Sequence, residues 1–441
     1  MTIPAGAPVI VVGLGLGDEA KGATVDFLCS QGDVAGVVRF NGGAQAAHNV
    51  IVDGRHHTFR QFGSGTLCGV PTFLSRYCLV EPIGLAGEAA ELAALGVPDP
   101  LSLITVDPDA LVTTGVHVAA NRTREDRRGT ARHGSTGLGI GETVWYELAL
   151  RRGARAGQVV ENLAAPADAR GRALRVRDCL DPRSLRRRLD ELVRFYAPLL
   201  AGGAHGHDDV EAMADLLEAF AGAVRIAAPG HLARTARQGP LVFEGAQGVL
   251  LDEWRGFHPH TTWSTTTPAN AQTLLAQAGL PPGYVLGLTR AYSTRHGAGP
   301  LPTQDPALLA VDEPYNGPGR FQGGWRAGHL DLVALRYAVE VIGGVDALAV
   351  SHLDVVDDPT LPAIHAVGAY RTASGVTGRL PVGPPRDLDH QAALTALLRG
   401  ATGQGRELAG SRDALVTLER AVGVPARVLG FGPDRSDRKV A

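Results

Sequence analysis

The sequence predicts an α/β fold with a mostly parallel central sheet flanked by helices, and with a helical insertion in the middle of the chain. Short β-branched runs near both ends of the chain lead into glycine-bearing or acidic loops, as strands of a parallel sheet do. Between these runs, alanine- and leucine-rich amphipathic stretches indicate a mainly helical region at about residues 85–230. No repeat or long low-complexity linker interrupts the chain, so we expect a single domain over residues 1–441.

The chain opens with a strand, a glycine-rich loop and a helix. Residues 8–13 (PVIVVG) form a β-branched run that glycine ends, and residues 24–29 have a helical pattern. This is the arrangement of P-loop-NTPase-like folds. A second strand at residues 36–40 (GVVRF) runs into the turn Asn41-Gly42-Gly43. We expect the two strands to be neighbours, so that their loops meet at one edge of the sheet.

The middle of the chain predicts helices, and the last third predicts strands. Residues 85–95 read as helical, Asp181 and Pro182 supply an N-cap and a first-turn proline for a helix over 183–200, and a further helix is expected over 208–225. The loop 202–207 (GGAHGH) has two histidines but no third ligand, which favours a solvated loop over a metal site. Strands are expected at 240–243, 284–288 and 345–350, each followed by a loop of the kind that binds ligands in open α/β sheets.

Composition favours a small-molecule enzyme. The formal net charge is -3 and both signs are mixed along the chain, which argues against a nucleic-acid or membrane partner. No run reaches the roughly 18 to 20 apolar residues of a membrane span, and the start lacks the basic region of a signal peptide. The four cysteines form no C-x-x-C pair, so they predict neither a zinc site nor a disulfide framework; they are Cys29, Cys68, Cys78 and Cys179. We expect reduced thiols and a cytoplasmic location.

Lysine is almost absent. Of 42 basic residues only Lys21 and Lys439 are lysines, which leaves forty arginines. Lys439 falls in a polar C-terminal tail, where disorder is an open expectation. Lys21 lies in the glycine-rich loop beside acidic residues, where a compact ammonium can reach what a wide guanidinium cannot.

Two motifs carry the chemistry. In residues 13–22 (GLGLGDEAKG), glycines let backbone amides surround phosphate oxygens and Lys21 can neutralise phosphate charge. This is not a Walker A sequence, because no Ser or Thr follows the lysine and Asp-Glu precedes it; on its own, a tight structural turn is the alternative. In residues 39–48 (RFNGGAQAAH), a lone His48 would more often be packed or exposed, but beside Asp18 it is a candidate acid for a base.

G-D-E-x-K-G followed by V-R-F-x-G-G-x-x-x-x-H resembles the opening of adenylosuccinate synthetases. Further matches follow in the same order: residues 134–141 (GSTGLGIG), 243–248 (FEGAQG) with 250–252 (LLD), 292–295 (YSTR) with 297–300 (GAGP), 328–331 (GHLD) with 333–336 (VALR), 353–355 (LDV) and 432–435 (GPDR). The resemblance covers nearly the whole chain. It implies a two-step reaction in which the 6-oxygen of IMP attacks the γ-phosphate of GTP and an amine then displaces the phosphate from carbon 6.

The resemblance also implies roles for individual residues. Asp18 would be the base and would hold Mg²⁺ with the backbone carbonyl of Ala47, His48 would be the acid, and Lys21 would contact phosphate. GTP would be bound by Gly17, Glu19, Lys21 and Gly22, with Asp354 reading guanine and with Gly432 and Pro433 as the other wall of its pocket. The substrate nucleotide would contact Gln45, Thr136, Gln247, Thr262 and Arg151, the last aligning with an arginine that the family donates across a homodimer interface.

The chain departs from the family most clearly where the amine donor binds. The family holds aspartate with arginines, and their aligned positions here are Leu138, Gly323 and Trp325; Arg320 and Arg326 are the arginines that could compensate. Losing each charge-assisted contact costs on the order of 1.5 to 3 kcal/mol. The hypothesis is therefore a GTP-dependent ligase with an altered, less acidic or more apolar donor.

Other departures affect the loop and the nucleotide pockets. Ala20 replaces a loop glycine, which is tolerable only if its φ is negative. Gln45 replaces an asparagine that helps to hold the substrate phosphate, and His352 replaces a lysine beside Asp354. His296 stands where valine is usual near the ribose, and residues 257–264 differ from the family segment. The substrate is therefore left open between IMP and another purine nucleotide or nucleotide-like metabolite. Two alternatives remain: an ordinary adenylosuccinate synthetase, and a GTP-binding regulatory protein without catalysis.

Overall fold

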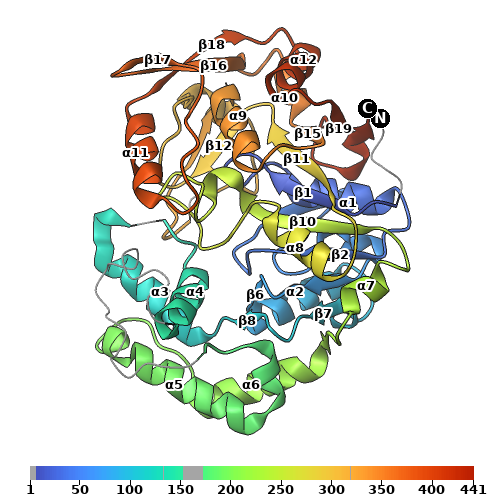
Figure 1. Ribbon diagram of the computed structural model, residues 1–441, viewed down its shortest axis with the longest axis vertical. Coiled ribbons are helices and arrows are strands. Elements are labelled where there is room, and N and C mark those ends of the chain that lie inside the picture. Colours follow the sequence, from blue (N-terminus) through green and yellow to red (C-terminus); the bar gives the residue numbers. More distant parts are fainter. Residues whose placement is uncertain (1–5, 133, 152–171, 318) are drawn as a thin grey trace.

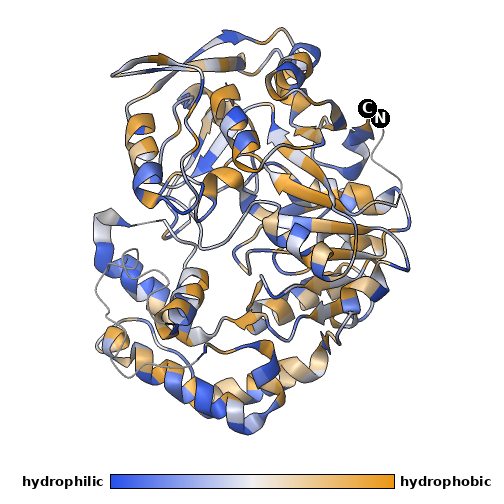
Figure 2. Ribbon diagram, in the orientation of Figure 1, coloured by the Kyte–Doolittle hydropathy of each residue, from blue (hydrophilic) through white to orange (hydrophobic). Residues whose placement is uncertain are grey.

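The central sheet has ten strands and confirms the α/β class. The computed structural model describes residues 6–132, 134–151, 172–317 and 319–441 (Figure 1). Among these, the sheet runs in the order β20 (Arg438–Val440), β19 (Ala426–Gly430), β15 (Ala347–Ser351), β11 (Tyr284–Arg290), β1 (Val9–Gly13), β10 (Leu241–Gly248), β2 (Gly36–Arg39), β5 (Thr72–Leu74), β7 (Ile104–Val106) and β9 (Arg225–Ile226). Neighbours are parallel throughout, except β19 and β20. The inner strands are fully buried and hydrophobic along most of their length, as in sheets covered on both faces (Figure 2).

Two expectations about strands are wrong. β1 and β2 are not neighbours, because β10 pairs with both and lies between them. The strand that separates them comes from about 200 residues further along the chain, and local pattern does not predict such long-range pairing. Lys439 lies in β20, where its ammonium stands 4.5 Å from the centre of the Phe431 ring. The C-terminal tail is therefore an edge strand, paired antiparallel with β19.

Helices dominate the predicted insertion. They are α2 (Pro82–Ala94), α3 (Gly115–Arg128), α4 (Ile140–Leu150), α5 (Pro182–Leu200), α6 (Val210–Ala223) and α7 (His231–Thr235), and Figure 1 shows α3 to α6 gathered below the sheet. Asp181 caps α5 by accepting from the Arg183 N–H at 3.1 Å, and Pro182 is its first residue, as predicted. α6 begins after the cap Asp209. Loop 202–207 stays outside any helix or strand, and no described His, Cys, Asp or Glu residues form a group of three that could hold a metal ion.

The remaining helices and strands lie outside the central sheet. These are α1 (Lys21–Ser30), the hairpin β3 (His48–Val52) and β4 (Arg55–Phe59), β6 (Leu79–Val80), β8 (Leu111–Val112), α8 (Ala269–Gln277), β12 (Ser293–His296), β13 (Trp325–Gly328), β14 (Leu330–Asp331), α9 (Leu332–Val341), α10 (Leu353–Asp357), β16 (His365–Thr372), β17 (Gly375–Thr377), α11 (Leu388–Arg399), β18 (Thr402–Glu407) and α12 (Ser411–Val422). Over the described residues, no helix is both long enough and apolar enough to cross a membrane.

Ala20 is strained in the loop that joins β1 to α1. Its φ is 60° and its ψ is 39°, the left-handed region that costs a residue with a Cβ roughly 1 to 2 kcal/mol. We expect Ala20→Gly to stabilise the protein by about 1 kcal/mol, because glycine adopts this conformation without steric cost. Urea unfolding would measure the change. Ala23→Gly, inside α1, is the matched control and should destabilise; equal destabilisation by both variants would contradict the expectation.

Candidate active site

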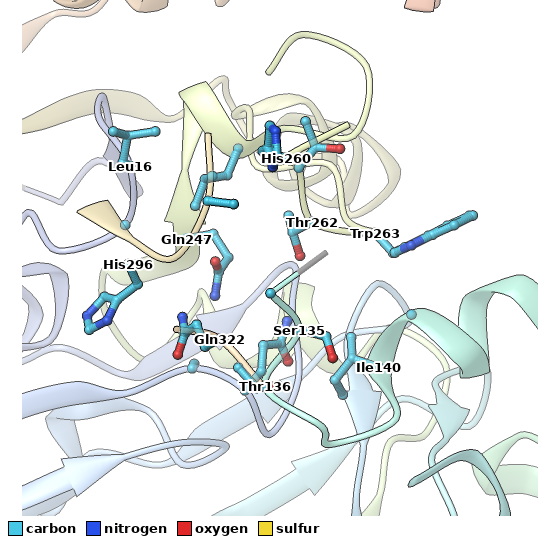
Figure 3. Close-up of a pocket in the computed structure, with 18 of the residues that line it drawn as sticks. Leu16, Ser135, Thr136, Ile140, Gln247, His260, Thr262, Trp263, His296 and Gln322 are labelled. Carbon is cyan, nitrogen blue, oxygen red and sulfur yellow. The ribbon is translucent and has the colours of Figure 1, made fainter. Parts of the chain in front are cut away.

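A cavity of about 700 Å³ opens at the carboxyl ends of the central strands. Its wall contains eight of the predicted site residues: Gly17, Asp18, Gln45, Ala47, His48, Thr136, Gln247 and Thr262. They come from the loops after β1 and β2, from the end of β10, and from the segments before α4 and α8. Figure 3 shows Gln247, Thr262, Ser135 and Thr136 around one central space. Segments far apart in sequence thus converge where open α/β sheets bind ligands.

His48 is held by a glutamate that the sequence analysis did not assign. Its Nδ1 lies 2.6 Å from Glu244 Oε1, and Ser64 donates to the same carboxylate from its hydroxyl at 2.5 Å and its N–H at 2.9 Å. Glu244 is in β10, the strand between β1 and β2. Burial raises the pKa of Glu244, but Arg39 and His48 outweigh it and hold the pKa at about 2. Glu244 lies in the FEGAQG motif, which points to it as a candidate site residue. Its contact with His48 could not be predicted, because the sequence does not show that β10 lies between β1 and β2.

The same pair fixes the state of the imidazole. Burial lowers the pKa of His48 to about 4, against the raising effect of Glu244. At neutral pH the ring is therefore uncharged, with Nδ1 donating to the ionised Glu244. Nε2 is then left to meet a ligand, and an anion at Nε2 would raise the pKa and make His48 a proton donor.

Asp18 faces the cavity with one carboxylate oxygen engaged. Oδ2 lies 3.4 Å from His296 Nε2 and accepts from the Thr294 hydroxyl at 3.4 Å. Burial raises the pKa of Asp18, but His296, Arg290 and Lys21 together lower it below its usual value. The sequence alone marks His296 only as a departure from the family near the ribose. In the folded chain its Nε2 contacts the carboxylate of the expected base.

Lys21 is buried in the loop and paired with Glu19. Its ammonium donates to the Gly17 carbonyl at 2.5 Å and to Glu19 Oε2 at 3.0 Å, while Glu19 Oε1 accepts from the Gly17 N–H at 2.8 Å. A Cβ added to Gly13 would stand 2.2 Å from this carboxylate. The Glu19 side chain thus fills the amide-lined concavity that suits a phosphate. Gly22 lies beside it at the start of α1, where a Cβ would stand 2.6 Å from His48 Cβ.

The residues assigned to guanine follow two adjacent strands. Asp354 comes just after β15 at the start of α10, and Gly432 and Pro433 come just after β19, its parallel neighbour. Burial raises the pKa of Asp354. None of the three lines the large cavity, so they form a separate rim at the same edge of the sheet.

The expected donor loop packs on the 134–141 loop without offering arginines to the cavity. Arg326 is committed to the chain itself, since it donates to the carbonyls of Gly297 at 2.6 Å and Gly299 at 2.9 Å and to Gln304 Oε1 at 3.1 Å. Arg320 is exposed, with its guanidinium 5.0 Å from the Phe321 ring centre. Leu138, Gly323 and Trp325 do not line the cavity; the loop contributes Gln322 instead. Arg326 therefore cannot take over the grip on a dicarboxylate while these contacts last.

Arg151 lies apart from the cavity in this chain. It is exposed at the C-terminal end of α4 and pairs with Glu147 one turn earlier. Its expected contact across a dimer interface involves a second copy, and it stays a prediction.

A glycine-rich strand-to-helix loop with a buried lysine, beside a large cavity at the carboxyl edge of a parallel sheet, defines a nucleotide-binding α/β enzyme. The model of the adenylosuccinate synthetase family matches residues 10–439. The chain therefore belongs to the adenylosuccinate synthetase family and is a GTP-dependent ligase that forms a carbon-nitrogen bond.

Relatives support this over the whole length. The adenylosuccinate synthetase of Ectopseudomonas mendocina (strain ymp) is 32% identical over 448 residues, which cover 98% of each chain. Adenylosuccinate synthetase 1 of Cupriavidus pinatubonensis is 33% identical over 466 residues, covering 98% of this chain and 96% of that one.

Two solved structures share the fold. Fully ligated adenylosuccinate synthetase from Plasmodium falciparum superposes with a TM-score of 0.78 at 19% identity, covering 99% of this chain and 100% of that one. The cyanophage S-2L succinoaminodeoxyadenylate synthetase, bound to dGMP and dATP as an energy donor, gives 0.55 at 15% identity, covering 99% and 96%.

Proposed function

We propose that this ligase transfers the γ-phosphoryl group of GTP to the 6-oxo group of IMP or a similar purine nucleotide, and that an amine other than aspartate then displaces the phosphate. An amide oxygen is a poor leaving group, and phosphorylation makes it a good one. Asp18 removes the ring N–H proton through the oxygen that faces the cavity, which sends electron density to the 6-oxygen. An anion close to His48 Nε2 favours protonation of that nitrogen, and the protonated ring then stabilises the developing negative charge while Glu244 holds the ring in place.

Gln45, Thr136, Gln247 and Thr262 are suited to hold the substrate nucleotide, since they line one wall with amide and hydroxyl groups. Both polar atoms of Gln45 are buried without a protein partner, which suits a ligand phosphate or base. Lys21 and the glycine-rich loop receive the GTP phosphates once Glu19 moves aside. Asp354, with Gly432 and Pro433, would read guanine, because a carboxylate can accept from two donors that adenine lacks.

A magnesium ion fits the oxygen atoms at this site. The Asp18 carboxylate and the Ala47 carbonyl both line the cavity, and Mg²⁺ is commonly held by one or two protein oxygens together with substrate phosphates. When bound, the ion would neutralise phosphate charge. The protein need not supply all of the ligands, because substrate phosphates and water can complete the coordination of Mg²⁺.

The change of donor rests on one observation: the expected donor loop brings no arginine into the cavity. Leu138, Gly323 and Trp325 replace the aspartate-gripping arginines, and Arg326 is held by three acceptors of the chain. A dicarboxylate needs bidentate, charge-assisted partners in a water-poor site, and each lost partner costs about 1.5 to 3 kcal/mol. On this proposal the donor carries a neutral or apolar side chain in place of the second carboxylate of aspartate. The cyanophage enzyme, whose ligands are dGMP and dATP, illustrates that this fold accommodates other substrate pairs.

A panel of amines tests the proposal. The enzyme is incubated with IMP, GTP and Mg²⁺ plus one amino acid at a time, including L-aspartate, L-asparagine, glycine and L-leucine, and GDP release is followed. We expect kcat/KM for a neutral donor to exceed that for L-aspartate. Best turnover with L-aspartate at micromolar KM would show an ordinary adenylosuccinate synthetase instead. GDP release that is the same with every amine and without any nucleotide acceptor would contradict both.

A further inference from the structure

Glu313 is the centre of a buried polar network that reaches Asp18 from two sides. It lies in the segment between the strands β12 and β13, and its side chain is only 13% exposed. One carboxylate oxygen, Oε1, accepts from Arg290 and from the Tyr292 hydroxyl, and the other, Oε2, accepts from Asn316 Nδ2 at 2.9 Å. Burial raises the pKa of Glu313, but Arg290 and His352 outweigh it, so the carboxylate stays ionised.

The first arm runs through Arg290 to the backbone of Asp18. Arg290 is 4% exposed and ends β11, the strand next to β1. While one side of its guanidinium pairs with Glu313, its Nη1 donates to the Asp18 carbonyl at 3.1 Å. A guanidinium presents its donors in a fixed plane, so the position of Glu313 sets the direction in which Arg290 holds that carbonyl.

The second arm runs through Asn316 and His296 to the Asp18 carboxylate. Because Asn316 donates to Glu313 from Nδ2, its Oδ1 must face the other way, and it lies 3.1 Å from His296 Nε2. Nε2 therefore carries a hydrogen, which it shares between Asn316 Oδ1 and Asp18 Oδ2 at 3.4 Å. Glu313 thus selects the imidazole tautomer that can donate to Asp18. With Oδ2 occupied, Oδ1 is the oxygen that is left to face the cavity.

A third contact connects Glu313 to the side where guanine is expected. His352 Nε2 lies 3.7 Å from Glu313 Oε1, and its ring meets Tyr292 edge-on at 5.7 Å between centres. His352 caps α10 two residues before Asp354, with a φ of 58° that fixes how the helix begins. If the start of α10 shifts when the nucleotide binds, the contact between His352 and the carboxylate of Glu313 therefore changes as well.

We infer that Glu313 is a positioning residue that aligns the base Asp18 through Arg290 and through Asn316 and His296, and that its contact with His352 couples this alignment to the guanine-nucleotide side of the site. The inference rests on the proposed role of Asp18. It assigns to Glu313 no contact with the reacting atoms. Positioning of this kind affects turnover steeply, because small displacements of a catalytic group of about 1 Å can cost roughly 10²-fold in rate.

The variants Glu313→Gln and Asn316→Ala distinguish the contribution of the arm through Arg290 from that of the arm through Asn316 and His296. Glu313→Gln weakens all three contacts, so we expect kcat to fall by roughly 10-fold or more and the affinity for GDP, measured by calorimetry, to fall as well. Asn316→Ala breaks the arm to His296 and leaves the ion pair of Glu313 with Arg290 in place. For it we expect a lower kcat with GDP affinity unchanged. Glu340→Gln, which removes an exposed glutamate that pairs with Arg379, is the matched control and should behave as wild type.

The outcomes distinguish this inference from the proposed function. If Asp18→Ala abolishes turnover while Glu313→Gln and Asn316→Ala retain wild-type kcat, the inference is overturned and the base assignment stands. If the loss of kcat in both variants follows a loss of thermal stability, or if Glu340→Gln shares it, Glu313 is only structural. Unchanged turnover in Asp18→Ala would show that Asp18 is not the base, and this would contradict the proposed function as well.

Discussion

Asp18→Ala is expected to abolish GDP formation while guanine-nucleotide binding persists. General-base catalysis contributes about 10²- to 10⁴-fold, and without proton removal the 6-oxygen is a weak nucleophile. The Asp18 side chain faces the cavity, and His296 and Thr294 hold one of its two oxygens in place. GDP release measures the first effect, and calorimetry with GDP measures the second.

Asp215→Ala provides the control for Asp18→Ala. Asp215 is an exposed aspartate of α6 that lies 3.8 Å from Arg186 and does not line the cavity. Its removal should leave both measurements at wild-type values. Wild-type turnover in Asp18→Ala would mean that Asp18 is not the base.

Arginines restored at the donor loop are expected to bring back aspartate as a substrate. Leu138→Arg with Trp325→Arg would return two charge-assisted partners, and at about 1.5 kcal/mol or more each they should raise kcat/KM for L-aspartate on the order of 10²-fold. Gly323 is left unchanged, because its φ of 92° would strain an arginine. Steady-state kinetics with L-aspartate and with the best neutral donor would show the switch.

Lysine at the same two positions provides the control for the arginine pair. It adds equal charge but lacks the planar fork that binds a carboxylate through two parallel hydrogen bonds, so the gain should be smaller. If neither pair raises turnover with L-aspartate, then the donor is not selected by charge at this loop.

Local signals in the sequence predicted most strands and helices near the site. β-branched runs ended by glycine marked β1 and β2, and Asp181 with Pro182 marked the start of α5. Pattern could not reveal that β10 inserts between β1 and β2, because strand pairing is long-range. Nor could it place Lys439 in an edge strand, since a short run with two charged residues at a terminus resembles a disordered tail.

The position of a residue at the cavity was predictable where one motif holds that residue, and not where two motifs meet. Asp18, His48 and Gln247 each lie in a motif of their own and all three line the cavity, while their roles stay predictions. Glu244 lies 196 residues from His48, so their contact depends on the sheet order. Glu313 was missed because it belongs to no motif and reaches Asp18 only through intermediates. Ala20 shows the same limit for the backbone, since residue type alone did not reveal its positive φ.

Transfer of oxygen from substrate to phosphate tests the central claim most directly. IMP labelled with ¹⁸O at its 6-oxo position is incubated with GTP, Mg²⁺ and the best amine of the panel, and the inorganic phosphate is examined by mass spectrometry. If the 6-oxygen attacks the γ-phosphate and leaves with it, each phosphate formed in the reaction carries one labelled oxygen. Phosphate without label, formed together with GDP, would mean that water attacks GTP and that the nucleotide is not activated through its oxygen.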